Sequence, residues 1–365
     1  MKICHIVDEL RVGGLEKTIV QIVSNISGHT HEVWCLKKKG VLAGQIEERG
    51  IVVREFGFGE SILSASTFVL KNELKRSKFD IVHSHGIYPY MWAQVAATFA
   101  GVPVHIAHVQ NTYMGLSFKN RIRLKLLSTF TSKFIAVSQA VKNNLIKELN
   151  IPSGKITVIY NSSPDLKNGL GMSRDSVRSS LGIKPDEFLT GSVGRLERFK
   201  GHHILLEAID RCRKASLKCK CILVGDGPVR MALERQVEKL GLSGCVIFAG
   251  WKNSIAEYMS AMDVVIQPSI SGEGLPLVLA EAASLSIPLI ATNVAGNNEI
   301  VQDGLSGFIV NPGDSHDLFH KIEYLYNRPS ETAQMGKASR DIWARNFRTE
   351  FMADKIDALY NGFSV

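Results

Sequence analysis

Residues 3–26 read ICHIVDELRVGGLEKTIVQIVSNI, and the rest of the chain repeats the pattern of this stretch. A short apolar run at residues 3–7 is followed by a turn at Gly13-Gly14 and by apolar residues spaced three and four apart over residues 16–26. Such a run is typical of a buried strand, and such a spacing is typical of an amphipathic helix. The stretch therefore predicts a strand, a glycine turn and a helix in succession.

The same alternation continues to about residue 160. We expect further strands at residues 33–37, 52–56, 80–83, 104–109 and 134–137, and helices at 42–49, 91–100 and 138–149. Strands that alternate with helices predict a parallel sheet with helices on both faces. The first half of the chain is therefore expected to be a doubly wound, Rossmann-like α/β domain.

A second series follows residues 161–174, which are rich in Asn, Ser, Pro, Asp and Gly and are the best candidate for a linker. We expect strands at 189–193, 221–224, 246–248, 264–267, 289–291 and 307–310, with helices at 201–215, 229–240, 254–260, 276–285 and 316–326. A polar helical tail is expected at 341–360. The predicted divisions are 1–165, 166–340 and 341–365, and two such α/β domains usually bind ligands in a cleft between their strand ends.

The bulk composition is that of an ordinary globular protein, with 365 residues of which 45% are apolar and 21% charged. No apolar run approaches the roughly 20 residues that span a bilayer, and the first ten residues favour a strand over a signal peptide. The six cysteines are scattered without a CxxC pair. They are expected to be reduced core residues of a cytoplasmic protein and not zinc ligands or disulfides.

Positive charge is concentrated in the first half. The net charge is +8, but residues 1–180 hold 23 Lys and Arg against 13 Asp and Glu. Partners for such a surface are nucleic acid, an anionic membrane or a phosphate-bearing acceptor. Residues 113–156 are the densest part, and a basic amphipathic helix on a membrane and an ordinary core-facing helix both fit them. Their basic residues are Lys119, Arg121, Arg123, Lys125, Lys133, Lys142, Lys147 and Lys155.

The most informative stretch is GEGLPLVLAEA at residues 272–282. Pro276 suits the first turn of a helix, and the free N–H groups near Leu275 and Leu277 then form a site for a diphosphate. Gly274 keeps this approach open. The helix start thus predicts an anion-binding site at the end of a strand.

Two acidic residues flank this helix start, where they would repel a simple phosphate. They make sense if the ligand carries hydroxyls on both sides of its phosphates, as a nucleotide-sugar does. Glu273 would then accept hydrogen bonds from the sugar, and Glu281 would bind the two hydroxyls of a ribose. The alternative is that Glu281 is a solvated helix residue and Glu273 a helix-start acid.

Two further motifs supply phosphate-binding groups. Arg195 and Lys200 follow the first strand of the second series, where they would neutralise a diphosphate and help it leave; the alternative is plain surface charge. Gly13 and Gly14 allow backbone N–H groups to approach a phosphate, or they form a turn that needs positive φ. We place both pairs with the donor-binding residues.

Histidines end two strands of the first series. His83 ends one expected strand and His85 lies two residues beyond it, while His108 lies in the next expected strand. At such strand ends a ring nitrogen can bond a sugar or a phosphate. A lone histidine is more often structural, but histidines at two strand ends favour a functional role. His108 is the first choice as a catalytic residue. Asn161 lies at the expected domain junction.

Together these motifs resemble the retaining glycosyltransferases of family 4, which have the GT-B fold. The resemblance covers nearly the whole chain, and the Glu-x7-Glu stretch is its most specific part. It implies that Glu273 contacts the sugar and Glu281 the ribose, while Arg195 and Lys200 bind the diphosphate. It also implies two Rossmann-like domains facing a cleft, with the C-terminal helix crossing back onto the first domain.

The resemblance implies further properties of the reaction. No metal or other cofactor is needed, because the nucleotide-sugar is a substrate. The acceptor is expected to be a saccharide or a lipid-linked molecule bound by the first domain, with the second domain binding the donor. The expected location is the cytoplasm, peripherally on the inner face of the membrane, in surface-polysaccharide or glycolipid assembly. The donor base, UDP or GDP, stays open.

Other functions compete with this one. An epimerase of the same architecture would convert a nucleotide-sugar with no acceptor present, and a non-catalytic protein would use the same site for binding alone. A nucleic-acid binder would exploit the basic half, but the sequence has no stacked-aromatic RNA motif, zinc finger or helix-turn-helix signature. We therefore expect no nucleic-acid partner.

Overall fold

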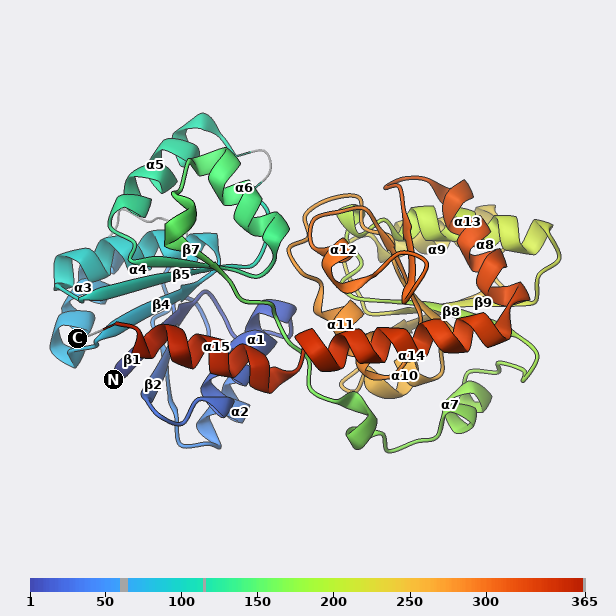
Figure 1. The fold of residues 1–365 in the computed structure, drawn as a ribbon, viewed down its shortest axis with the longest axis horizontal. Helices are drawn as coiled ribbons and strands as arrows, with labels where there is room; N and C mark the ends of the chain where they lie inside the picture. Colours follow the sequence, from blue (N-terminus) through green and yellow to red (C-terminus); the bar gives the residue numbers. More distant parts are fainter. Residues whose placement is uncertain (60–64, 114–115, 364–365) are drawn as a thin grey trace. The chain divides into compact units, whose positions relative to one another are not determined.

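The computed structural model describes residues 1–59, 65–113 and 116–363, which form two compact units (Figure 1). Unit 1 comprises Met1–Ser162 and Thr349–Val365, and unit 2 comprises Ser163–Arg348. The basic stretch at 113–156 and the tail expected at 341–365 each include two residues, 114–115 and 364–365, that lie outside this description. Among the described helices, none is both long enough and apolar enough to cross a bilayer.

Unit 1 is built on a parallel sheet in the order β3-β2-β1-β4-β5-β6-β7. The register places His5 of β1 opposite Val33 of β2 and His83 of β4, and His85 opposite His108 of β5. The strands are β1 (Lys2–Val7), β2 (Thr30–Cys35), β3 (Val52–Glu55), β4 (Ile81–His85), β5 (Val104–Val109), β6 (Lys133–Ala136) and β7 (Ile156–Val158).

Alternate residues of each strand point to opposite sides of this sheet. Both sides carry apolar residues, and helices cover both faces. Ile3 and Ile81 belong to a core shared with α1 and α15, whereas Cys4 and Val82 belong to a core shared with α3 and α4. The helices are α1 (Gly14–Asn25), α2 (Ala43–Glu47), α3 (Ala65–Ser77), α4 (Ile87–Ala100), α5 (Phe118–Thr129), α6 (Gln139–Leu149) and α15 (Thr349–Asn361).

Unit 2 repeats the design with a parallel sheet in the order β10-β9-β8-β11-β12-β13. Its strands are β8 (Phe188–Val193), β9 (Cys219–Val224), β10 (Val246–Gly250), β11 (Val264–Gln267), β12 (Leu289–Thr292) and β13 (Gly307–Val310). The helices are α7 (Arg174–Ser180), α8 (His202–Lys214), α9 (Arg230–Lys239), α10 (Ala256–Ser260), α11 (Leu277–Ser284), α12 (Asn297–Ile300), α13 (Ser315–Asn327) and α14 (Pro329–Asn346). The strand order reverses at β8, between β9 and β11, which is where doubly wound sheets bind ligands.

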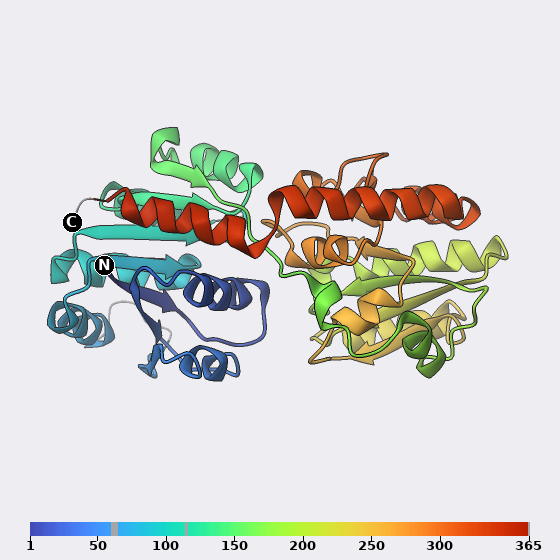
Figure 2. The same cartoon turned by 60° about the horizontal axis from the view of Figure 1, so that its bottom comes forward.

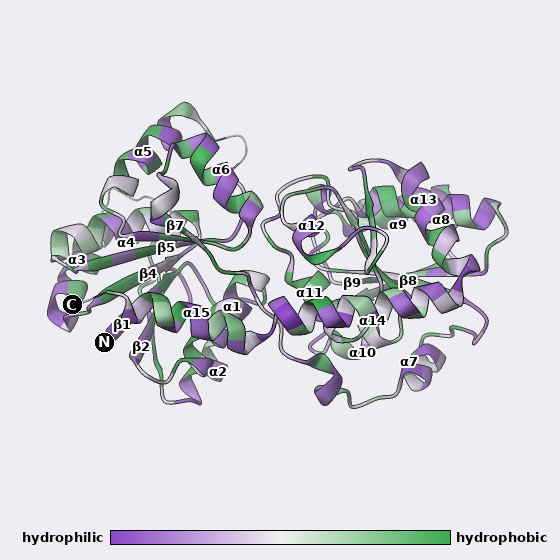
Figure 3. Ribbon diagram, in the orientation of Figure 1, coloured by the Kyte–Doolittle hydropathy of each residue, from purple (hydrophilic) through white to green (hydrophobic). Residues whose placement is uncertain are grey.

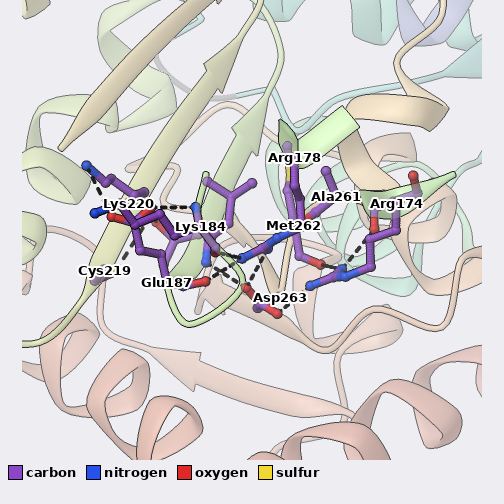
Figure 4. A network of polar contacts seen from close by, with 12 residues as sticks. Arg174, Arg178, Lys184, Glu187, Cys219, Lys220, Ala261, Met262 and Asp263 are labelled. Carbon is purple, nitrogen blue, oxygen red and sulfur yellow. Dashed lines mark hydrogen bonds and ion pairs between the residues drawn. The ribbon is translucent and has the colours of Figure 1, made fainter. Parts of the chain in front are cut away.

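The expected linker leads into α7, which is fastened to the base of unit 2 (Figure 4). Arg174 and Arg178 of α7 both donate to the carboxylate of Asp263, at 2.5 and 3.1 Å, and the backbone N–H of Leu189 donates to it at 2.6 Å. Arg178 also donates to the carbonyl of Ala261 at 2.9 Å. These bonds join the segment after the linker to the starts of β8 and β11.

The last two helices depart from the single polar tail expected at 341–360. The break expected between residues 340 and 341 falls inside α14, and the chain leaves the helix only at Phe347. The following helix, α15, belongs to unit 1 and packs beside α1 (Figure 2). It is amphipathic (Figure 3), because Met352, Ile356 and Tyr360 are buried against the sheet. The doubly wound fold class and the return of the C-terminal helix to the first domain are thus confirmed.

Candidate functional site

A buried carboxylate lies at the ligand-binding edge of unit 2. Glu273, beyond the end of β11, is 5% exposed. Its Oε1 accepts hydrogen bonds from Lys200 Nζ at 2.7 Å, Gln267 Nε2 at 2.8 Å and Ser269 Oγ at 2.5 Å. A buried charge is tolerated only with such partners. The structure therefore brings together Lys200 and Glu273, which lie 73 residues apart in the sequence.

The backbone around this pair is tightly fitted. Gly201 has φ +70°, and a Cβ on it would lie 1.9 Å from the carbonyl oxygen of Pro268. The N–H of Ile270 donates to the carbonyl of Phe199 at 2.7 Å. The turn that carries Lys200 is therefore pressed against the loop that carries Glu273, and only glycine fits at position 201.

The helix start behind Glu273 supplies backbone donors. Helix α11 begins at Leu277, with Pro276 at its N-cap, one position earlier than the first-turn placement expected. The first N–H groups of a helix have no acceptor within it, so the N–H groups near Leu277 are donors without an acceptor inside α11. Glu281 lies in this helix and is only 6% exposed, which contradicts the alternative of a solvated residue.

Arg195 occupies a different environment from Lys200. It follows β8, its side chain is 61% exposed, and it pairs with Glu197 at 2.9 Å. Gly194 before it has φ +150° and its carbonyl oxygen lies 2.0 Å from a Cβ that would stand on Gly225. Arg195 is thus an exposed cation at the strand end, whereas Lys200 contacts the buried carboxylate.

The neighbouring His202 was not singled out from the sequence. It begins α8, two residues after Lys200, and is 2% exposed. Burial, and to a lesser degree the charge of Lys200, lowers the pKa of His202 to about 4. Its Nδ1 is buried without a hydrogen-bond partner in the described residues. A neutral imidazole therefore stands beside the Lys200 turn.

The structure excludes one of the two expectations for the glycine turn of unit 1. Gly13 is the N-cap of α1 with φ −162°, an extended conformation that any residue adopts, and Gly14 already belongs to the helix. Neither glycine has positive φ, so the alternative of a turn that needs positive φ is wrong. A Cβ on Gly13 would meet only the flexible carboxylate of Glu16, at 2.3 Å.

The strand-end histidines belong to a buried cluster on one face of the unit 1 sheet. We call it the histidine cluster; its members are His5, His31, His83, His85 and His108, on four adjacent strands. All five are less than 8% exposed. Ring centroids of neighbours are about 4.3 to 5.3 Å apart. The cluster fills a polar layer between the sheet and the helices that cover this face.

A directed chain of hydrogen bonds runs through three of these rings. His31 Nε2 lies 3.0 Å from the carbonyl oxygen of Ile26, so this nitrogen carries a proton. His31 Nδ1 then accepts from His5 Nε2 at 3.0 Å, and His5 Nδ1 accepts from His85 Nε2 at 3.1 Å. The tautomers follow from the acceptor-only carbonyl at one end. Burial lowers the pKa of each ring, to about 4 for His31, so the chain is neutral.

His108 lies at the other side of this cluster. It is 2% exposed, both ring nitrogens lack a hydrogen-bond partner within the described part of the chain, and burial lowers its pKa to about 3. Ligand nitrogens of His5, His83 and His85 lie within 4.8 Å of one another, a spacing that fits a metal ion. However, His5 and His85 already bond each other. The arrangement is accounted for by hydrogen bonding and ring contacts among neutral side chains.

The basic stretch forms an exposed helix with an apolar stripe. Helix α5 is anchored by Leu124 and Ser128, the two residues that it buries. We call its exposed side chains that recur every fourth residue the α5 stripe: Phe118 at 78%, Ile122 at 51%, Leu126 at 62% and Phe130 at 55% exposure. Lys119, Arg121, Arg123 and Lys125 interleave with them on exposed positions. A simple core-facing helix with a charged outer face does not account for this stripe.

Comparison with known proteins shows which family this chain resembles. Residues 12–162 match the model described as Glycosyltransferase Family 4, and residues 173–342 match the model described as Glycosyl transferases group 1. Each match falls on one of the two doubly wound units. Together the two models cover most of the chain, which belongs to the glycosyltransferases that they describe. This glycosyltransferase is therefore an enzyme of the family predicted from its motifs.

Named relatives of the glycosyltransferase cover most of its length. It is 29% identical over 79% of its chain, and 76% of the relative, to a UDP-Gal:alpha-D-GlcNAc-diphosphoundecaprenol alpha-1,3-galactosyltransferase of Escherichia coli. It is 26% identical over 95% of its chain, and 94% of the relative, to O-antigen chain mannosyltransferase C of the same species. The crystal structure of Anabaena Alr3699/HepE in complex with UDP covers both chains fully, with a TM-score of 0.89 and 24% identity, and shares the fold.

Proposed function

We propose that this glycosyltransferase moves a sugar from a nucleotide-sugar bound by unit 2 to a saccharide or lipid-linked acceptor bound by unit 1. The observation that carries the proposal is the ion pair between Lys200 and the buried carboxylate of Glu273, beside the start of α11. A cation, a helix N-terminus and a carboxylate lie together at one edge of the unit 2 sheet. This combination suits a ligand that carries both a diphosphate and sugar hydroxyls. The named Escherichia coli galactosyltransferase, with its UDP-Gal donor, supports this ligand class.

Each predicted residue receives one role in this proposal. Lys200 and Arg195 neutralise the diphosphate, with the N–H groups at the start of α11, near Gly274, Leu275 and Leu277, completing its site. Glu273 accepts hydrogen bonds from the transferred sugar. Buried Glu281 binds the ribose. These residues stand on three neighbouring segments of unit 2 and bind, orient and stabilise charge without forming a covalent bond.

We propose that transfer retains the anomeric configuration. The acceptor hydroxyl attacks from the face of the departing diphosphate, a donor phosphate oxygen takes its proton, and the bond from the anomeric carbon to the diphosphate breaks. Negative charge then builds on the diphosphate, where Arg195 and Lys200 stabilise it. No metal is required because these cations and the helix start supply the charge. NMR of the product decides the point, since an inverted product would exclude this mechanism.

His108 stays a predicted catalytic residue without an assigned proton transfer. Its two nitrogens are enclosed in the histidine cluster, so the step above does not pass through it. His108→Gln keeps a donor and an acceptor of similar size. A fall in turnover of about a hundredfold, with an unchanged melting temperature, would support a catalytic role; unchanged turnover would remove one.

The α5 stripe favours an acceptor held at a membrane. Apolar side chains flanked by lysine and arginine are typical of helices that lie in the interface of an anionic bilayer. The acceptor in the name of the galactosyltransferase relative, a diphosphoundecaprenol, is a lipid. We propose that α5 seats unit 1 on the cytoplasmic face of such a membrane, in polysaccharide or glycolipid assembly.

The first experiment is a thermal-shift panel of UDP-, GDP-, ADP- and TDP-sugars with the native chain and Glu281→Ala. We expect one nucleotide class to raise the melting temperature and the variant to weaken the shift. Incubation of that nucleotide-sugar without acceptor tests the competing epimerase, which would convert it. The absence of any shift would contradict the donor site and favour a non-catalytic role.

A further inference from the structure

We propose that Gln267 and Ser269 are positioning residues for the Glu273 carboxylate, and that recognition of the transferred sugar depends on them while recognition of the nucleotide does not. The inference rests on the proposed function, because it takes the donor to be a nucleotide-sugar with its sugar at Glu273. It adds two residues that neither the motifs nor the family resemblance singled out.

Three donors from two segments meet at one carboxylate oxygen. Gln267 is the last residue of β11, Ser269 follows it, and Lys200 comes from the turn after β8. Gln267 and Ser269 are 2% and 0% exposed. Gln267 Nε2 also donates to Ser269 Oγ at 2.9 Å, which orients the hydroxyl toward Glu273. In a site this dry, water does not replace a donor that the carboxylate loses.

A second layer of bonds fixes the serine itself. Thr292 Oγ1 donates to the carbonyl of Ser269 at 2.6 Å, and Asn297 Nδ2 donates to the carbonyl of Thr292 at 2.9 Å. Thr292 ends β12, the strand beside β11. The aim of the Ser269 hydroxyl is therefore set by the neighbouring strand and does not depend on a bound ligand.

The charged donor Lys200 and the two neutral donors differ in how exposed they are and in which groups they can bond. The side chain of Lys200 is 21% exposed. Its ammonium group can therefore donate to Glu273 and also to a diphosphate bound at the surface. Gln267 and Ser269 are enclosed and bond Glu273 alone among acidic side chains of the described chain. Their removal should disturb the carboxylate and leave the phosphate-binding cations in place.

The test compares two ligands in two variants. Dissociation constants are measured by calorimetry for UDP and UDP-glucose, and for GDP and GDP-mannose, with the native chain, Ser269→Ala and Gln267→Met. We expect the constant for the bound nucleotide-sugar to rise about tenfold or more, as for a lost hydrogen bond to a charged group, and that for the nucleoside diphosphate to stay within about twofold. Gln267→Glu should be worse than Gln267→Met because it sets a second carboxylate beside Glu273.

Ser339→Ala is the matched control. Ser339 is also a buried serine of unit 2, at 1% exposure, and it donates to the carbonyls of Ile287 and Gly336 at 2.8 Å, away from Glu273. It should lower the melting temperature as much as Ser269→Ala and leave both dissociation constants unchanged. If Ser269→Ala does not fold, Ser269→Cys, with a weaker donor of similar size, and Gln267→Met carry the test.

The outcomes separate this inference from the proposed function. Equal weakening of nucleotide and nucleotide-sugar, or no weakening of either, would overturn the positioning role while the donor site stands. A native chain that binds none of the four probes or the wider sugar panel would overturn the proposed function, and the positioning role with it.

Discussion

His83 of β4 and Tyr360 of α15 lie 277 residues apart in the sequence, yet the His83 Nδ1 and the Tyr360 hydroxyl are 2.6 Å apart in the interior of unit 1. Both side chains are fully buried. The bond ties the last helix to the middle of the sheet, inside the layer that the histidine cluster fills. It gives α15 a specific position on a face that apolar contacts alone would leave free to slide.

Tyr360→Phe removes this bond while keeping the ring. We expect the free energy of unfolding of unit 1 to fall by about 1–3 kcal/mol, because His83 Nδ1 is left buried without a partner. Chemical denaturation measures the free energy of unfolding, and hydrogen exchange of the backbone amides in β4 and α15 shows where the structure is loosened. A variant as stable as the native chain would show that the bond does not fasten α15.

Acid should destabilise unit 1 more than unit 2. The folded state lowers the pKa of the cluster histidines, to about 4 for His31 and about 3 for His108, whereas the unfolded chain protonates them near pH 6.5. The unfolded state therefore binds more protons between these values. Stability is full above about pH 6.5 and falls as the pH drops, by about 1.4 kcal/mol per pH unit for each such ring.

Calorimetry from pH 7.5 to 4.5 checks this expectation. Within unit 2, a lowered histidine pKa is resolved in the described residues for His202 alone, so its transition should move less. His31→Asn and His108→Gln should flatten the pH dependence of unit 1. Equal acid sensitivity of both units would contradict the role of the cluster.

Removal of either phosphate-binding cation should slow transfer. For Lys200→Ala and Arg195→Ala we expect turnover to fall by roughly 30- to 900-fold, as for about 2–4 kcal/mol of lost transition-state stabilisation. Arg213→Ala is the control, because Arg213 forms an ion pair with Asp210 on α8 of the same unit. Near-normal turnover in both site variants would remove the assignment.

The α5 stripe should bind anionic vesicles. Co-sedimentation of the native chain with vesicles that contain phosphatidylglycerol should fall as NaCl rises, because screening weakens the contribution of the basic residues. The double variant Ile122→Ser and Leu126→Ser should bind less at every salt concentration. Met231→Ser, which changes an exposed apolar residue of unit 2, should bind like the native chain. Equal binding of all three proteins would exclude α5 as the membrane surface.

Much of the strand framework was predictable because buried parallel strands leave short apolar runs. Strands β5, β11 and β13 begin and end at the residues expected, and the remaining expected strands shift by one to three residues. Only the end of α14 lies within the expected helical tail, because the apolar residues of its first part are diluted by polar ones; α14 packs against α11. Strand β7 is only three residues long, too short to show a period.

The site was predictable in its members more than in its contacts. Lys200 and Glu273 were each expected to bind a ligand, but their contact depends on β8 lying beside β11, which follows from sheet order and not from residue type. Gln267 and Ser269 gave no signal, since an amide and a hydroxyl near a strand end are common. The histidine cluster had a partial signal in His83, His85 and His108, whereas His5 and His31 join it only through register.

The membership of α15 in unit 1 has a consequence for how the protein is made. A ribosome synthesises residues 1–162 long before it reaches Thr349. The nascent first domain therefore lacks α15, and the part of its sheet that α15 covers stays exposed while the whole of unit 2 is synthesised. That face carries Ile3, Ile81 and Ile106, which in the finished protein pack with Met352 and Ile356. Chaperone contact during translation should therefore be longest for this surface, and a premature stop in unit 2 would leave both domains defective at once.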